Sequence, residues 1–116
     1  MTMKSPITTH VLDTMRGEPA AGIKVVLELQ NDSSKWDKLA EGKTDNDGRI
    51  GDLLLGARLV AGIYRLTFQT GAYFEAKGIK AFYPYVTVAF EVTGSNSNYH
   101  VPLLLSPFGY STYRGS

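Results

Sequence analysis

The chain ends in YHVPLLLSPFGYSTYRGS (99–116), the stretch that points most directly to its fold. Residues 99–106 and 109–114 are rich in apolar, aromatic and β-branched side chains, which favour strands. Pro and Gly in SPFG (106–109) mark a tight turn between them, so we expect a β-hairpin. The run VPLLL (101–105) does not alternate polar and apolar residues, so both of its faces should be covered, one of them partly by another subunit.

Further short strand-like runs, separated by turn residues, occupy most of the remaining chain. The turn signal at NDG (46–48) is the strongest of them. Only residues 70–78 have helix-like ends, with a Thr at the start and a Gly at the stop. Counting the hairpin, the strand-like segments are residues 7–13, 23–30, 38–45, 49–55, 62–70, 85–93, 99–106 and 109–114. This pattern predicts an all-β fold, an antiparallel sandwich or barrel of eight strands with one short helix.

The composition fits a single soluble domain spanning residues 1–116. The sequence is 43% hydrophobic and 20% charged, with a formal net charge of +1, so neither nucleic acid nor an anionic membrane is expected as a partner. No apolar run approaches the ~20 residues that span a bilayer. The first 13 residues lack the pattern of a secretory signal, and the last three are not a peroxisomal address, so we expect a cytoplasmic location.

Two histidines, His10 and His100, lie in predicted strands. Histidine is the side chain best suited to proton transfer near neutral pH, although a lone strand histidine is more often a hydrogen-bonded structural residue. A metal site would need a third ligand, and the chain has no cysteine and no His-x-His spacing, so neither a metal nor another cofactor is expected.

Arg49 and the last four residues are the other candidates for chemistry. Arg49 follows the NDG turn, where a solvated surface arginine is the ordinary interpretation. The ending YRGS (113–116) joins hydroxyl groups to a cation, and the strand-type residues before it favour an ordered tail over a frayed one. If the strand continues to the end, Thr112, Arg114 and Ser116 share one face and Tyr113 lies on the other.

Three segments, in this order, resemble the 5-hydroxyisourate hydrolases, the transthyretin-related enzymes of urate degradation. They are ITTHVLDTMRGEPAAGIKVVLEL (7–29), TDNDGRI (44–50) and YHVPLLLSPFGYSTYRGS (99–116). The terminal Tyr-Arg-Gly-Ser is the signature of these enzymes, whereas transthyretin shares the fold and lacks this ending. The resemblance implies a transthyretin-like eight-stranded antiparallel β-sandwich. It also implies edge-strand dimers that assemble into a homotetramer, with active sites in the channel between dimers.

The activity implied by the resemblance is hydrolysis of 5-hydroxyisourate to 2-oxo-4-hydroxy-4-carboxy-5-ureidoimidazoline, a step on the route from urate to allantoin. This chemistry needs an activated water and a stabilised oxyanion, without a metal or redox cofactor. The residues that match the family's catalytic positions are His10, Arg49, His100 and Ser116. Those implied in substrate binding are His10, Arg49 and Tyr113, and those supporting the C-terminal motif are Arg114 and Gly115.

The resemblance also suggests a division of roles. Either His10 or His100 would accept the proton of the water, while the other orients or protonates the substrate. Arg49 would bind electron-rich substrate oxygens through two parallel hydrogen bonds. The Ser116 hydroxyl would hold the water or a histidine, and Arg114 would position the tail.

Two other functions compete with hydrolysis. One is a transthyretin-type carrier that binds a hormone or another small ligand in the channel between dimers, and the other is a purely structural sandwich that self-assembles. A carrier needs neither a pair of proton-transfer groups nor an arginine in its channel. The two histidines, Arg49 and the YRGS ending therefore favour the hydrolase.

Overall fold

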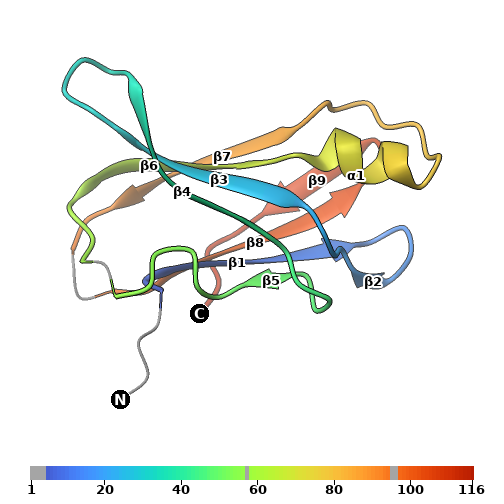
Figure 1. Cartoon of the computed structure of the whole chain (residues 1–116), viewed down its shortest axis with the longest axis horizontal. Coiled ribbons are helices and arrows are strands. Elements are labelled where there is room, and N and C mark those ends of the chain that lie inside the picture. Colours follow the sequence, from blue (N-terminus) through green and yellow to red (C-terminus); the bar gives the residue numbers. More distant parts are fainter. Residues whose placement is uncertain (1–4, 57, 95–96) are drawn as a thin grey trace.

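Two β-sheets lie face to face in the computed structural model, which describes residues 5–56, 58–94 and 97–116 (Figure 1). One sheet has the strand order β2-β1-β8-β9, with β5 also paired to β1, and the other has the order β4-β3-β6-β7. The elements are β1 (Ile7–Asp13), β2 (Glu18–Pro19), β3 (Lys24–Gln30), β4 (Trp36–Lys43), β5 (Arg49–Ile50), β6 (Gly62–Phe68), α1 (Thr70–Ala76), β7 (Val86–Val92), β8 (Tyr99–Ser106) and β9 (Gly109–Thr112). The predicted all-β sandwich with one short helix is confirmed.

The described residues form nine strands rather than the predicted eight, because the two-residue strand β2 had no strand signal of its own. β5 is also shorter than predicted, since it ends at Ile50 and the rest of 49–55 forms a turn. The Leu53 side chain in this turn is buried in the core, and the Leu54 N–H donates to the Ser5 hydroxyl at 3.0 Å. The leucine-rich sequence after Ile50 predicted a longer paired strand. These residues instead form a turn that buries a leucine side chain in the core.

β1 and β8 pair in parallel, through seven residue pairs from Ile7 with Tyr99 to Asp13 with Leu105. The predicted antiparallel sandwich therefore contains one parallel pair. Parallel neighbours need a long connection between them, and here all of the second sheet serves as that connection. β8 lies between β1 and β9. Val101, Leu103 and Leu105 are buried in the core, whereas Leu104, on the outer face, is half-buried.

The β8–β9 hairpin forms at the predicted turn, with Ser106 paired to Gly109. Its ladder ends at the pair Leu103–Thr112, next to Pro102, which has no N–H to donate. Pairing resumes at a single bridge between His100 and Gly115. β9 is therefore two residues shorter than the predicted strand 109–114, but the tail stays in register with β8.

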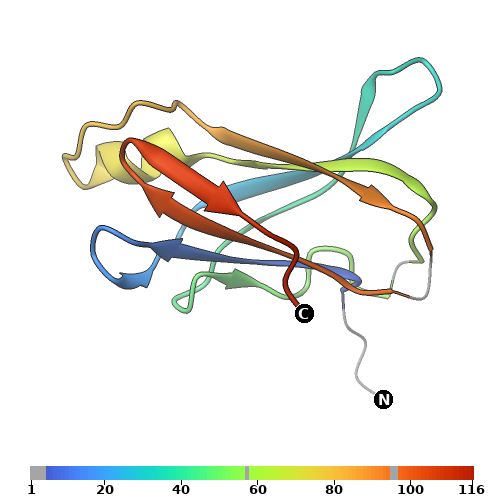
Figure 2. The same cartoon turned by 180° about the vertical axis from the view of Figure 1, so that it is seen from behind.

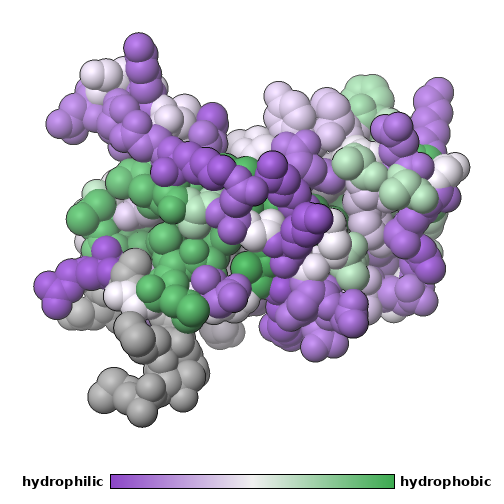
Figure 3. Space-filling model, in the orientation of Figure 1, coloured by the Kyte–Doolittle hydropathy of each residue, from purple (hydrophilic) through white to green (hydrophobic). Residues whose placement is uncertain are grey.

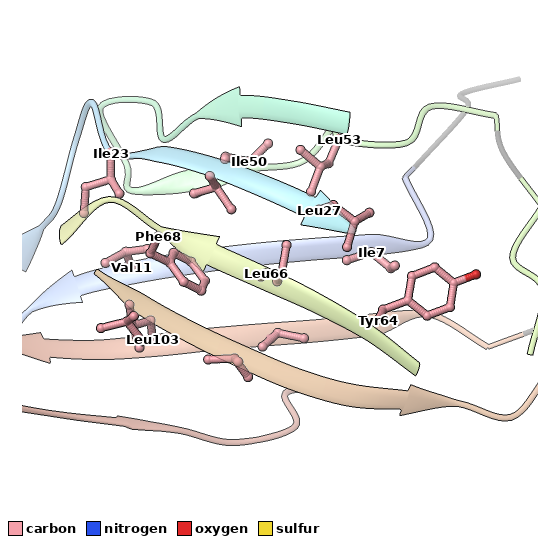
Figure 4. Packing of buried hydrophobic residues seen from close by; sticks show 14 of the residues in the cluster. Ile7, Val11, Ile23, Leu27, Ile50, Leu53, Tyr64, Leu66, Phe68 and Leu103 are labelled. Atoms are coloured by element: carbon pink, nitrogen blue, oxygen red, sulfur yellow. The ribbon is translucent and has the colours of Figure 1, made fainter. Parts of the chain in front are cut away.

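The core fills the space between the two sheets, as Figure 4 shows for its labelled side chains. Alternate residues of β1 point inward, so that Ile7, Thr9, Val11 and Asp13 are buried. The intervening residues Thr8, His10 and Leu12 are half-buried on the outer face of the same strand. One strand thus contributes both to the core and to the outer face of its sheet.

On the face shown in Figure 3, hydrophobic surface gathers toward the end of the sandwich away from α1. The exposed apolar side chains of the molecule include Leu39, Leu55 and Val60. Leu39 is exposed because of a β-bulge: Leu27 pairs with Ala40 while Glu28 pairs with Lys38, which leaves Leu39 as the extra residue. No helix in the described part of the chain has the length and apolar character needed to cross a membrane.

Helix α1 is fastened to the end of β1 through a buried carboxylate. The Tyr73 hydroxyl donates to Asp13 Oδ2 at 2.8 Å, and the Arg16 N–H donates to Asp13 Oδ1 at 3.2 Å. Burial, followed by the hydrogen bond to Asp13, raises the pKa of Tyr73 well above its usual value. Asp13 is fully buried, so these two donors compensate for its loss of hydration.

We expect Tyr73→Phe to lower the free energy of unfolding by about 1–3 kcal/mol, because it leaves a buried carboxylate short of a donor. Urea titration followed by circular dichroism measures this loss. The control is Tyr85→Phe, which removes a hydroxyl from an exposed side chain and should change stability by less than ~0.5 kcal/mol. Equal transition midpoints for the two variants would contradict the anchoring role of Asp13.

Candidate active site

The outer faces of β1 and β8 bring the two histidines onto one surface. The parallel register pairs Thr8 with His100 and His10 with Pro102. His10 and His100 therefore lie diagonally across neighbouring strands, which are about 5 Å apart in a sheet. Both histidines are half-buried, so each keeps contact with solvent while belonging to a rigid ladder.

The predicted NDG turn delivers Arg49 to the same face. The Asp45 carboxylate accepts hydrogen bonds from the backbone N–H groups of Asp47 at 2.9 Å and Arg49 at 3.0 Å. Gly48 adopts a φ of 75°, and a Cβ at this position would lie 2.4 Å from the Val11 carbonyl oxygen. Only glycine lets the turn approach β1 this closely, and β5 then pairs Arg49 with His10.

The C-terminal tail leaves β9, crosses β8 and ends near the segment that follows β5 (Figure 2). The Gly115 N–H donates to the His100 carbonyl oxygen at 2.8 Å. A Cβ on Gly115 would lie 2.5 Å from Cδ2 of the His100 ring. The tail therefore packs directly on the imidazole, and glycine is required for this contact.

A surface depression of about 490 Å³ lies between the tail, β1 and β5. His100, Arg49 and Ser116 all line it. The other residues that line it are Ser5, Thr8, Thr9, Ile50, Gly51 and Asn98. His10 lies beside this depression, opposite Arg49. The structure thus brings four predicted site residues together from three strands and the tail.

The surroundings of His100 favour its neutral form. Burial lowers the pKa of His100, and the positive charge of Arg49 and the nearby His10 lower it further, while a hydrogen bond to the Thr8 backbone partly opposes them. An imidazole that is neutral near pH 7 can accept a proton. The arrangement thus provides a proton acceptor close to a guanidinium cation.

Tyr113 and Arg114 lie on the other side of the tail. They line a separate pocket of about 220 Å³ that also contacts β7 and His100. The Arg114 guanidinium lies 4.7 Å from the centre of the Tyr99 ring, a cation–π contact that holds the tail. Arg114 and Ser116 therefore line different pockets, and the alternation expected of a continuous strand does not extend beyond Thr112, where the regular ladder ends.

Thr8, Asn98 and Ser5 are residues of the depression that the sequence did not single out. The two-residue period of a strand places Thr8 on the same face as His10. This period was the one sequence signal that could have indicated Thr8 as a site residue. Its contact with His100 depends on the parallel register, which that period does not specify. Among the described residues, no three His, Cys, Asp or Glu side chains gather as metal ligands.

Fold and site together define a transthyretin-like β-sandwich that carries a histidine–arginine site on the outer face of one sheet. The chain belongs to the HIUase/Transthyretin family, whose model matches residues 7–115.

Similar proteins occur among both branches of this family. The 5-hydroxyisourate hydrolase of Salmonella typhimurium is 48% identical over 110 residues, which cover 95% of this chain and 80% of that protein. The mouse (Mus musculus) enzyme of the same name is 46% identical and covers 99% and 98% of the two chains. Among solved structures, Klebsiella pneumoniae 5-hydroxyisourate hydrolase is 36% identical with a TM-score of 0.80, covering 95% and 98%. Sea bream transthyretin in complex with thyroxine is 31% identical with a TM-score of 0.91, covering 96% and 95%.

We expect Gly115→Ala to detach the tail from β8, because the added methyl group would overlap the His100 ring. Loss of a hydrogen bond worth about 1.4 kcal/mol should speed amide exchange in residues 113–116 about tenfold, as measured by hydrogen–deuterium exchange mass spectrometry. The control is Gly94→Ala, whose Cβ would meet no atom within 4 Å. Unchanged exchange in the Gly115 variant would show that the tail does not depend on this contact.

Proposed function

We propose that this chain, as a single transthyretin-like domain, hydrolyses 5-hydroxyisourate to 2-oxo-4-hydroxy-4-carboxy-5-ureidoimidazoline. The observation that carries the proposal is the convergence of His100, Arg49 and Ser116 on one depression. The relatives named 5-hydroxyisourate hydrolase, at 46% and 48% identity over nearly the whole chain, support it. The cytoplasmic location expected from the sequence remains part of the proposal.

The reaction requires water to add to a ring carbonyl carbon, after which the bond from that carbon to the ring nitrogen breaks. The neutral His100 imidazole is suited to accept the proton of the attacking water. Arg49 is suited to stabilise the oxygen that gains negative charge, because its guanidinium presents several donors in one plane. The released nitrogen needs a proton, and His10, which lies on β1 between the strands that carry Arg49 and His100, is placed to provide it.

The tail residues have supporting roles in this mechanism. Ser116 lines the depression with His100, so its hydroxyl can hold the water or the substrate. Arg114 and Gly115 hold the tail against Tyr99 and His100. Tyr113 lines the separate pocket of about 220 Å³ rather than the depression. Its contact with substrate stays a prediction.

We further propose that the protein acts as a homotetramer, a dimer of dimers. β7 and β9 are the outermost strands on one side of the two sheets in the described structure, and free strand edges favour pairing with another chain. Leu12 and Leu104 add half-buried apolar surface to the outer face that carries the site. A second dimer packed on this face would enclose the depression and exclude water from it.

A small-ligand carrier is the second candidate function. The observation in its favour is the close match to a transthyretin solved in complex with thyroxine. A carrier would bind its ligand in the channel between dimers without turnover. Steady-state hydrolysis therefore separates the two candidates, because only the enzyme accelerates the loss of 5-hydroxyisourate above its spontaneous decay.

We expect His10→Ala and His100→Ala each to lower the hydrolysis rate by ~10²–10⁴-fold, the usual cost of removing a general acid or base. Absorbance of freshly generated 5-hydroxyisourate measures this rate. Light scattering confirms that each variant remains tetrameric, and Asp37→Ala in β4, an exposed residue away from the site, should keep the parent rate. Parent-like turnover by both histidine variants would overturn the assigned roles.

The lowered pKa of His100 gives a further prediction. Protonated imidazole cannot accept a proton, so kcat/KM should fall as pH drops through this pKa, which lies below the ordinary pKa of histidine. Arg49→Gln removes a positive charge that disfavours the imidazolium, so it should raise the pKa of His100 measured by NMR titration. Arg16→Gln, a change at an exposed arginine outside the site, should leave the titration unchanged. A lower or equal pKa in the Arg49 variant would refute this electrostatic link.

A further inference from the structure

We infer that Thr8 is a positioning residue that fixes the imidazole of His100 with Nε2 toward the depression. The Thr8 hydroxyl oxygen lies 2.8 Å from His100 Nδ1. This contact joins neighbouring strands at residues that are directly paired in the β1–β8 ladder. The inference rests on the proposed hydrolysis, because it assigns Thr8 a role in presenting the proton acceptor of that reaction.

Thr8 decides between two orientations of the ring. The terminal torsion of histidine is broad and roughly two-fold, so rotation by about 180° exchanges Nδ1 with Cδ2 and turns Nε2 away. The backbone of His100 is fixed by the ladder and by the Gly115 N–H. Neither contact identifies a ring nitrogen, whereas the Thr8 hydroxyl does, since a hydrogen bond distinguishes nitrogen from carbon.

The inference includes a preferred tautomer of His100, with hydrogen on Nδ1. A hydroxyl can accept a hydrogen bond from a protonated Nδ1, and Nε2 then carries the lone pair that takes up a proton. A hydrogen bond to the Thr8 backbone also raises the pKa of His100. This is the effect of a backbone acceptor, which stabilises the protonated imidazole. Acceptors on Thr8 therefore favour hydrogen on Nδ1. Nε2 has no hydrogen-bond partner among the described residues and remains available to substrate water.

The neighbouring threonine shows that this role is specific to the outer face. Thr9 points inward, where it is buried, and its hydroxyl donates to the Val101 carbonyl oxygen at 2.6 Å. That bond joins the same two strands but touches no titratable group. Both threonines line the depression, but only the Thr8 hydroxyl contacts a titratable side chain, the imidazole of His100.

The test compares Thr8→Val with Thr8→Ser. Valine keeps the β-branched shape and removes the hydroxyl. Because the His100 base would then be misplaced, kcat should fall by up to ~10²-fold, whereas KM should change less than about twofold. Serine keeps the hydroxyl and should restore kcat to within about threefold of the parent. The matched control is Thr87→Val, which removes another hydroxyl contact between strands, at 3.2 Å from Thr67 on the other sheet, and should retain parent kinetics.

An NMR measurement of the His100 ring nitrogens provides a readout independent of activity. The parent and Thr8→Ser should show hydrogen on Nδ1, and Thr8→Val should show a mixture of tautomers. Retention of the Nδ1–H form in Thr8→Val would overturn the inference, and so would an altered tautomer with unchanged kcat. If the parent does not hydrolyse 5-hydroxyisourate, the proposed function fails, and the tautomer measurement alone then decides whether Thr8 positions the ring.

Discussion

The parallel pairing of β1 with β8 is the constraint on which the rest of the molecule depends. It joins residues 92 positions apart in the sequence, such as Thr8 and His100. The inner side chains of both strands, among them Val11 and Leu103, enter the core. Their outer side chains include both histidines. Because side chains alternate along a strand, a register shift of one residue in either strand would exchange its core and site residues.

Each element around this ladder brings one component of the site to a fixed place. β5 is only two residues long, yet its pairing with β1 sets Arg49 opposite His10. The tail crosses β8 and places Ser116 at the depression. The site is therefore assembled on the backbone hydrogen bonds of one sheet, a rigid scaffold of the kind that precise positioning of reacting groups requires.

Local signals in the sequence predicted most of the elements, whereas the candidate site residues followed from the resemblance to the 5-hydroxyisourate hydrolases. The turns at residues 46–48 and 106–109 depend on Gly, Pro and Asn chemistry, which acts within a few residues. The two-residue period correctly placed Thr8 and His10 on one face of β1. The two-residue period does not predict which strands pair, because it describes the two faces of a strand and not its neighbours. The parallel pairing of β1 with β8 and the Thr8–His100 contact could therefore not be predicted from the sequence pattern.

The remaining errors have equally specific causes. The leucines after Ile50 resemble a strand, but their side chains are used to cover the core from a turn. At the other end, the tail loses strand geometry beside Pro102, so Arg114 and Ser116 separate to opposite sides of it. In both places tertiary packing overrides a local preference, as is common in sheets.

The long separation between β1 and β8 also determines the order of events during folding. A growing chain makes β1 almost first, but its principal partner is absent until residues 99–106 have been synthesised. Contacts between such distant segments must overcome a large loop-closure entropy, which places proteins of this kind among the slower folders, on the millisecond-to-second scale. Until closure, β1 is an unprotected strand edge open to misassociation. The ladder that aligns the two histidines thus forms only after most of the chain has been synthesised.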